Sequence, residues 1–307
     1  MSCISGFVKA RRPRLNPDIM SLLRVVSYNI HKGRSLGGRD SLAALRLGLH
    51  RLSPDLLFLQ EVQGRNEQRM TLHAQHESLA AALHMEVAYG CNAIRPLTHH
   101  GNALLSRFPI SDFENEDISD HKLEQRGLLH AQIRIADQTL HCFVIHLGLF
   151  AGSRVKQVEA MAMRIKRLVP DEAPILIAGD FNDWRDELAP LFVKQLGVNE
   201  AFSLAPKTAG DIPRIRDSMR HIGHVLRGQR SISGLTNEAK HHVNQLPLSG
   251  AQSIRQPPKT FPAKFPLLRL DRIYQRGFAV KKAQVLRGRP WTLLSDHAPL
   301  LVEIELG

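Results

Sequence analysis

Short apolar runs alternate along the chain with segments whose apolar residues recur at helical spacing. The apolar runs predict strands at 23–30, 56–59, 102–106, 128–135, 140–145, 175–178, 270–274 and 299–306. Helical spacing, with a proline after two of the segments, predicts helices at 41–52, 77–85, 153–168 and 186–196. This many strands beside so few helices favours an α/β fold in which helices cover two stacked sheets.

One segment interrupts this alternation. The stretch 207–259 contains no Phe, Tyr or Trp, and its positive residues far outnumber its negative ones. Its Ser, Gly, Gln and His content predicts a long basic loop insert. An electrostatic arm for nucleic acid or anionic lipid is the alternative, and the absence of aromatic stacking residues favours the plain solvated insert.

Composition narrows the class of protein. The 307 residues include 41 Lys and Arg against 29 Asp and Glu, which gives a formal charge of +12. Three irregularly spaced cysteines argue against a disulfide framework or a cysteine metal site. No apolar run is long enough to span a bilayer, and the basic start of the chain lacks a signal-peptide core. We expect residues 1–20 to be a disordered leader and residues 21–307 to form one domain. The expected location is the cytoplasm, and peripheral contact with the inner membrane surface is an alternative within it.

Polar side chains gather where the predicted strands end. They are Asn29, Glu61, His146, Asp180 and Asn182 of the GDFN sequence at 179–182, Asp271, and the Ser-Asp-His sequence at 295–297. Carboxylates next to apolar strands are costly to bury unless they are paired or bound to a metal. Because strand ends converge on one rim of a sheet, these groups are expected to share one cleft.

Such a set suits metal-assisted phosphoryl transfer. Glu61 offers a hard oxygen ligand for Mg²⁺ or Mn²⁺, and Asn29 adds an amide oxygen. Asp180 could accept the proton of an attacking water, with Asn182 orienting that water. His297 could stabilise charge on the phosphate, with Asp271 fixing its tautomer. His146 could contact another phosphate oxygen.

The ordered motifs resemble the endonuclease/exonuclease/phosphatase superfamily, which includes the DNase I-like nucleases. They are SYN (27–29), LQE (59–61), IHLG (145–148), GDFN (179–182), LDRI (270–273) and SDHAP (295–299). The resemblance implies a four-layer α/β sandwich and a Mg²⁺-dependent phosphoesterase with the roles given above. It also implies a place for Asp296 near the metal. HHGNALLSRFPI (99–110) and FPAKFPLLRLDRIY (261–274) resemble a narrower bacterial branch, the YbhP-like proteins, and Asn102 and Arg126 fall where the family often places phosphate-contacting groups.

The chain also departs from well-known branches of that superfamily. His31 stands where AP endonucleases have an aspartate, which suggests one strong metal site. The residues after GDFN and around LDRI differ from those of AP endonucleases and inositol 5-phosphatases, so neither specificity is implied. His99 and His100 are interpreted as surface residues. Trp184 is expected to pack against the following helix, and Leu267 and Leu268 are interpreted as core or rim rather than as a lipid anchor.

Three functions are compatible with these patterns. The leading prediction is a Mg²⁺-dependent hydrolase of phosphodiesters, most simply a nuclease, because the charge and the motif set both suit nucleic acid. A phospholipid or other lipid-linked phosphodiester is the alternative substrate. An inactive scaffold that binds phosphate or nucleic acid is the alternative from another class, and the full catalytic set argues against it. The patterns predict no protein partner.

Overall fold

The computed structural model describes residues 22–66, 74–95, 98–121, 124–206 and 256–306. The predicted leader at 1–20 and most of the predicted basic insert, residues 207–255, lie outside the described residues. Residues 256–259, the end of that insert, are described and lead into the site. In these ranges no helix is long and apolar enough to cross a membrane.

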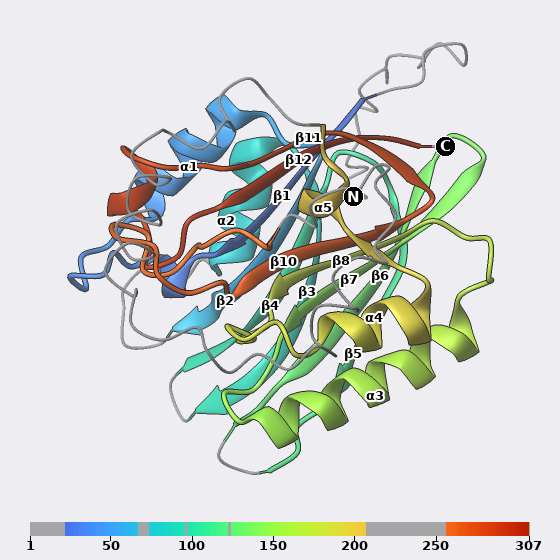
Figure 1. The fold of residues 1–307 in the computed structure, drawn as a ribbon. Helices are drawn as coiled ribbons and strands as arrows, with labels where there is room; N and C mark the ends of the chain where they lie inside the picture. Colours follow the sequence, from blue (N-terminus) through green and yellow to red (C-terminus); the bar gives the residue numbers. More distant parts are fainter. Residues whose placement is uncertain (1–21, 67–73, 96–97, 122–123, 207–255, 307) are drawn as a thin grey trace, which may run out of the picture.

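Two six-stranded mixed sheets form the centre of the molecule (Figure 1). The first sheet has the order β11 (Phe278–Val285), β12 (Leu300–Leu306), β1 (Leu23–Asn29), β2 (Leu56–Asn66), β4 (Thr98–Ser106) and β3 (Glu86–Arg95). The second has the order β5 (Ile110–Asp117), β6 (Gly127–Ile135), β7 (Gln138–His146), β8 (Ile175–Asp180), β10 (Asp271–Arg276) and β9 (Asn199–Glu200). The predicted fold class, a four-layer sandwich of two stacked mixed sheets, is confirmed.

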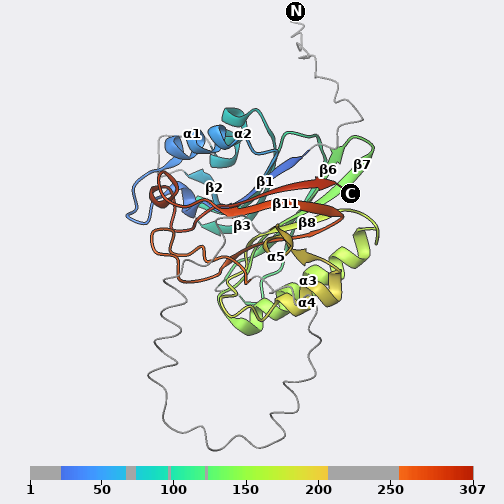
Figure 2. The same cartoon turned by 45° about the horizontal axis from the view of Figure 1, so that its top comes forward.

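Helices cover the outer face of each sheet (Figure 2). The first sheet carries α1 (Leu42–Leu52) and α2 (Gln75–Leu83), and the second carries α3 (Ala151–Leu168) and α4 (Ala189–Leu196). The short α5 (Ala201–Leu204) and the 3-10 turns η1 (His31–Gly33) and η3 (Trp291–Leu293) complete the described elements. Three apolar clusters fill the spaces between the layers, one between the sheets and one beneath each helical layer.

The strands missed by the apolar pattern lie at the edges of the sheets. β11 and β3 close the first sheet, and β5 and β9 close the second. Central strands are buried on both faces and form continuous apolar runs, whereas an edge strand exposes one side to water. Within β5, Asp112 and Glu114 are exposed, so its sequence has the composition of a loop. Helix boundaries also differ, including those of α2, α3 and α4. In α3 the first residue is Ala151, and the Ser153 hydroxyl donates to Asp120 at 2.9 Å instead of capping the helix.

Two parallel strand pairs, each joined by a helix, bring the polar strand ends together. α1 connects β1 to β2, and α3 connects β7 to β8. The carboxyl ends of parallel neighbours meet at one edge of a sheet, which is where α/β proteins form their sites. In the second sheet the register aligns His146, Asp180 and Asp271 in one row across β7, β8 and β10. In the first sheet it sets Asn29 opposite Gln60.

A buried histidine pair between β6 and β7 makes stability depend on pH. His130 Nε2 lies 3.1 Å from His141 Nδ1, and the His130 ring stacks on Phe143 with centroids 4.2 Å apart. Burial, reinforced by His141 and Arg164, lowers the pKa of His130 to about 4. The unfolded chain, with an ordinary histidine pKa near 6.5, therefore binds a proton at a pH where the native protein does not.

We expect the free energy of unfolding to fall by up to about 3 kcal/mol as the pH is lowered from 6.5 to 4, because His130 takes up a proton in the unfolded chain but not in the native protein. A His130→Gln variant, whose side chain does not titrate, should lose less over that interval. Urea unfolding of both proteins across the interval measures the difference. Parallel pH profiles for the two proteins would contradict the assignment.

Candidate active site

A cleft of about 410 Å³ opens at the polar strand ends. Its walls hold most of the predicted site together with residues the sequence did not single out: Lys32, Glu61, His100, Arg126, His146, Leu149, Asp180, Asn182, Trp184, Phe261, Leu268, Leu270 and His297. Both sheets contribute to it, because Glu61 belongs to β2 whereas His146 and Asp180 end β7 and β8. Glu61, Arg126, His146, Asp180, Asn182 and His297 of the predicted site thus line one cleft, whereas Asn29, Asp271 and Asp296 are not among its lining residues.

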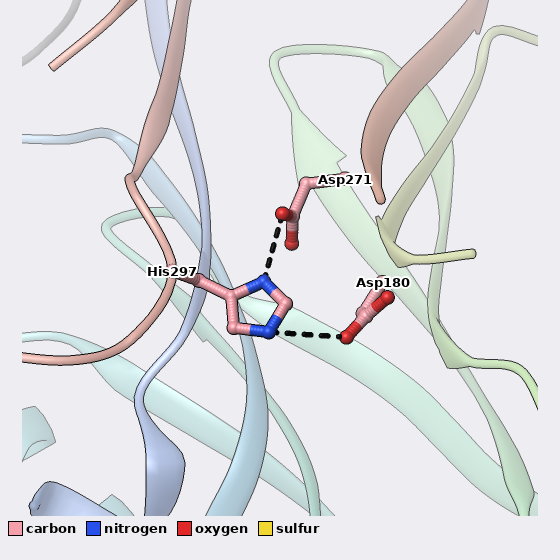
Figure 3. Close-up of side chains that lie close together, drawn as sticks. All are labelled: Asp180, Asp271 and His297. Carbon is pink, nitrogen blue, oxygen red and sulfur yellow. Dashed lines mark hydrogen bonds and ion pairs between the residues drawn. The ribbon is translucent and has the colours of Figure 1, made fainter. Parts of the chain in front are cut away.

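His297 lies between two buried carboxylates (Figure 3). Its Nδ1 is 2.9 Å from Asp271 Oδ2, and its Nε2 is 3.6 Å from Asp180 Oδ2. Burial by itself would lower the pKa of His297, but Asp271 and Asp180 outweigh it and raise that pKa to about 10. The imidazole is therefore a cation at neutral pH, and its Nε2 side faces the cleft carboxylate.

Asp180 is buried, with partners from several elements. Its Oδ1 accepts the backbone N–H of Asn182 at 3.0 Å, and its Oδ2 accepts Asn29 Nδ2 at 3.1 Å. His146 Nε2 lies 3.7 Å from the same Oδ2. Burial raises the pKa of Asp180, and His297 and His146 offset part of that rise. A carboxylate with a raised pKa is a stronger base than an ordinary aspartate.

The GDFN turn fixes Asn182 beside Asp180. Asn182 has a φ of 51°, and its Nδ2 donates to the Leu147 carbonyl at 2.9 Å. Gly179 has a φ of 156°, and a Cβ there would lie 1.9 Å from the Ile145 carbonyl oxygen of β7. The turn therefore needs glycine at 179 so that β7 and β8 can approach and align their last residues.

Glu61 is ionised and bound from two sides. Its Oε2 is 3.1 Å from Lys32 Nζ, and its Oε1 accepts Asn29 Nδ2 at a long 3.4 Å. Burial alone would raise the pKa of Glu61, but His146 and Lys32 lower it to about 2. Burial and Arg126 in turn lower the pKa of His146 to about 4, so at neutral pH Lys32 carries the charge that compensates Glu61.

The donor set suits a hard divalent cation. Asn29 Nδ2 donates to both Glu61 and Asp180, so the oxygens of these two carboxylates face a common space. Asp271 Oδ1 is a further buried oxygen with no hydrogen-bond partner among the described residues. Carboxylate oxygens are the ligands that Mg²⁺ and Mn²⁺ favour.

The geometry also separates the predicted ligands. Asp180, Asp271 and His297 have potential ligand atoms within 4.8 Å of one another, and His297 already contacts Asp271 through its Nδ1. The Asn29 amide oxygen accepts the His31 backbone N–H at 3.1 Å. Asp296 lies 3.8 Å from His31 Nδ1. In the described structure, Asn29 thus presents its nitrogen, not its oxygen, to Glu61.

The two weaker phosphate candidates differ in position. Arg126 lines the cleft, and its Nε donates to the Leu147 carbonyl at 3.2 Å. Asn102 is buried, and its Nδ2 donates to the Gly127 and Val144 carbonyls at 3.0 and 3.2 Å. Asn102 is not among the residues that line the cleft.

Three residues that line the cleft were not predicted from the sequence to be there: Lys32, His100 and Trp184. Lys32 follows β1 by three residues, and a basic residue so close to a polar strand end was the available signal. His100 lines the cleft and is half-buried, so it is not a plain surface residue. Trp184 lines the cleft and stays 43% exposed, with the Arg154 guanidinium 5.6 Å from its ring centroid.

A family model described as the Endonuclease/Exonuclease/phosphatase family matches residues 26–297. The chain belongs to this family. The family is one of hydrolases, and the predicted membership is confirmed.

Relatives of known sequence or structure agree with this assignment. The chain is 34% identical to the protein YbhP of Escherichia coli strain K12 over 293 residues, which cover 92% of this chain and 96% of YbhP. Zebrafish (D. rerio) TDP2 complexed with a single strand DNA product superposes with a TM-score of 0.61 at 18% identity, covering 93% of this chain and 99% of TDP2. The human Nocturnin catalytic domain with bound sulfate gives 0.63 at 18% identity, covering 93% and 94%. At these identities the two structures show a shared fold.

Replacing Gly179 tests the turn that carries Asp180 and Asn182. Gly179→Ala places a Cβ against the Ile145 carbonyl, so β7 and β8 must separate, and we expect stability to fall by at least about 2 kcal/mol. Gly152→Ala in α3 is the matched control, because no atom lies within 4 Å of its added Cβ. Urea unfolding compares the two, and equal midpoints would show that the close approach is not required.

Proposed function

We propose that this protein hydrolyses phosphodiesters with the help of a divalent cation, Mg²⁺ or Mn²⁺. The observation that carries the proposal is the buried Asp180 carboxylate, held in the cleft between His297, His146 and Asn29. One water adds to phosphorus and one ester P–O bond breaks. The products are a phosphomonoester and an alcohol.

Each described side chain then has a role. Asp180 accepts the proton of the attacking water, and Asn182 orients that water. Glu61 is the main ligand of the cation, Asp296 is proposed beside it, and Asn29 holds Glu61 and Asp180 together through its Nδ2. Bound there, the cation would polarise the phosphate and lower the pKa of water. Supporting this role, Glu61 is ionised and faces the same space as Asp180.

Three side chains of the cleft are proposed to stabilise the phosphate. The protonated His297 neutralises charge that develops on the phosphate oxygens, and Asp271 fixes its orientation through the 2.9 Å contact. His146 and Arg126 contact other phosphate oxygens from the cleft wall. Asn102 as a phosphate contact stays a prediction, because its amide instead holds the backbones of β6 and β7.

Two substrate classes fit this reaction. The formal charge of +12 supports nucleic acid, as does the single strand DNA product bound by the structurally similar TDP2. A lipid-linked diester is favoured by a different observation, the apolar residues Leu149, Trp184 and Leu268 in the cleft wall. The alternative of an inactive binding scaffold is not favoured, because binding alone does not require a base (Asp180), an orienting amide (Asn182) and a cationic His297 around one space.

Removing the metal should abolish turnover. Hydrolysis of bis-p-nitrophenyl phosphate is expected to require Mg²⁺ or Mn²⁺, to stop when EDTA is added, and to return with excess Mg²⁺. Release of p-nitrophenol measures it, and the His297→Ala variant controls for contaminating enzymes. An undiminished rate in EDTA would overturn the metal-dependent mechanism.

Substituting the proposed base should separate catalysis from folding. Asp180→Asn keeps the shape of the side chain but removes its basicity, so kcat should fall by about a hundredfold or more. The variant should still fold, because Asp271 remains 2.9 Å from His297 to compensate its charge, and the melting temperature checks this. Turnover like that of the unmodified protein would remove Asp180 as the base.

A further inference from the structure

Large apolar side chains are exposed around the mouth of the cleft. Phe265 and Leu267 are 70% and 66% exposed, and their neighbours from two other loops are also open to water. We call this set the apolar rim: Leu149, Phe150, Trp184, Phe265, Leu267 and Leu268. It comes from the loop after β7, the loop after β8 and the segment before β10, which lie on the same side of the molecule in Figures 1 and 2.

The segment that carries Phe265 and Leu267 is a folded turn. The backbone N–H groups of Leu267 and Leu268 both donate to the Phe261 carbonyl at 2.8 Å. The Phe265 N–H donates to the Pro262 carbonyl at 3.1 Å. The turn satisfies its backbone and yet turns its apolar side chains to water. An exposed apolar patch of this kind typically marks an interaction surface.

The same turn is attached to the catalytic segment. The Ala263 N–H donates to the Asp296 carbonyl at 2.6 Å, and the Ala298 N–H donates to the Thr260 carbonyl at 2.9 Å. The Phe261 ring lies 5.0 Å from the His297 ring. Whatever the apolar rim contacts is therefore held at a fixed position relative to the proposed phosphate site.

Positive charge accompanies the apolar rim. Lys264 is exposed, with its Nζ 5.7 Å from the Phe265 ring centroid. Arg185 follows Trp184 directly and is also exposed, with its guanidinium 3.8 Å from the exposed Glu187 carboxylate. In the sequence, the basic stretch 207–259 leads straight into this turn. Apolar side chains flanked by Lys and Arg are the pattern of a surface that binds anionic bilayers.

The aliphatic members of the apolar rim favour lipid over nucleic acid. Bases stack on aromatic rings, and a single-strand groove combines such rings with positive charge. Leu149, Leu267 and Leu268 have no ring to offer, and they gain free energy only by leaving water for an apolar phase. The Arg154 guanidinium lies over one face of the Trp184 ring, 5.6 Å from its centroid, so that face is not open for stacking on a base.

We propose that the apolar rim inserts into the surface of an anionic lipid bilayer, so that the phosphodiester of a phospholipid headgroup enters the cleft. This inference rests on the proposed phosphodiesterase function and names its substrate class. Three rim residues, Leu149, Trp184 and Leu268, line the same cleft as His297 and Asp180, so a headgroup phosphate just outside the hydrocarbon is presented to these two residues. A lipid held in this way needs no groove for its acyl chains.

Vesicle sedimentation of the full chain tests the docking without requiring turnover. The probes are phosphatidylcholine vesicles with and without a minority of phosphatidylglycerol. The unmodified protein should bind the anionic vesicles, and Phe265→Ser/Leu267→Ser should bind at least about tenfold more weakly. The matched control is Leu47→Ser/Met163→Ser, which removes comparably exposed apolar side chains from α1 and α3. It should bind like the unmodified protein. Melting temperatures check that both variants fold.

Several results would overturn the docking. One is failure of the unmodified protein to bind anionic vesicles, and another is undiminished binding by Phe265→Ser/Leu267→Ser, which would assign binding to charge elsewhere in the chain. A third is that the Phe265→Ser/Leu267→Ser variant loses affinity for single-stranded DNA while no protein binds vesicles.

Turnover by the unmodified protein separates this inference from the proposed function. Mg²⁺-dependent release of glycerol phosphate from phosphatidylglycerol vesicles, with nucleic acid left intact, supports both the proposed function and the docking. Hydrolysis of bis-p-nitrophenyl phosphate without vesicle binding removes the docking alone. Vesicle binding that depends on the apolar rim, without hydrolysis of any diester, overturns the proposed function but supports the apolar rim as a bilayer-binding surface.

Discussion

The burial of the Asp180 carboxylate is the constraint that organises this molecule. A charge withdrawn from water must be compensated by nearby donors, or it is not kept. The donors come from places far apart in the sequence: Asn29 ends β1, His146 ends β7, and His297 precedes β12. Only a stack of two sheets with their polar strand ends on one side brings these groups to one carboxylate. The apolar layers hold the sheets in that arrangement.

Backbone strain is present at the same place. Glu61, Asn182, His31 and Lys32 all have positive φ angles, which non-glycine residues adopt at a cost. Asn182, His31 and Lys32 follow strand ends, and Glu61 lies at a register irregularity within β2. The strain turns side chains away from the regular alternation of a strand and into the cleft. The extensive burial of β1, β2, β7 and β8 supplies the stability that maintains it.

The cleft and its rim differ in chemistry. The floor is a compact set of charges with their partners, as phosphoryl transfer requires. The rim is aliphatic and aromatic, and its backbone is held by hydrogen bonds to the segment that carries His297. A polar floor beneath an apolar mouth matches an amphiphile, whose phosphate and apolar parts are joined. A polymer with phosphates along its whole length would instead favour a polar and basic mouth.

The apolar pattern of the chain predicts the central strands and the polar residues that follow them. β1, β2, β7 and β8 are enclosed on both faces and therefore form apolar runs, and the polar residue that ends each run is conspicuous. The edge strands β3, β5, β9 and β11 lack that enclosure, so their residues follow no apolar pattern. Only the tertiary structure placed Lys32 on Glu61, turned the Asn29 nitrogen toward the carboxylates, and exposed Phe265 and Leu267. Such features depend on which distant segment packs beside a residue, and apolar periodicity records burial along one element alone.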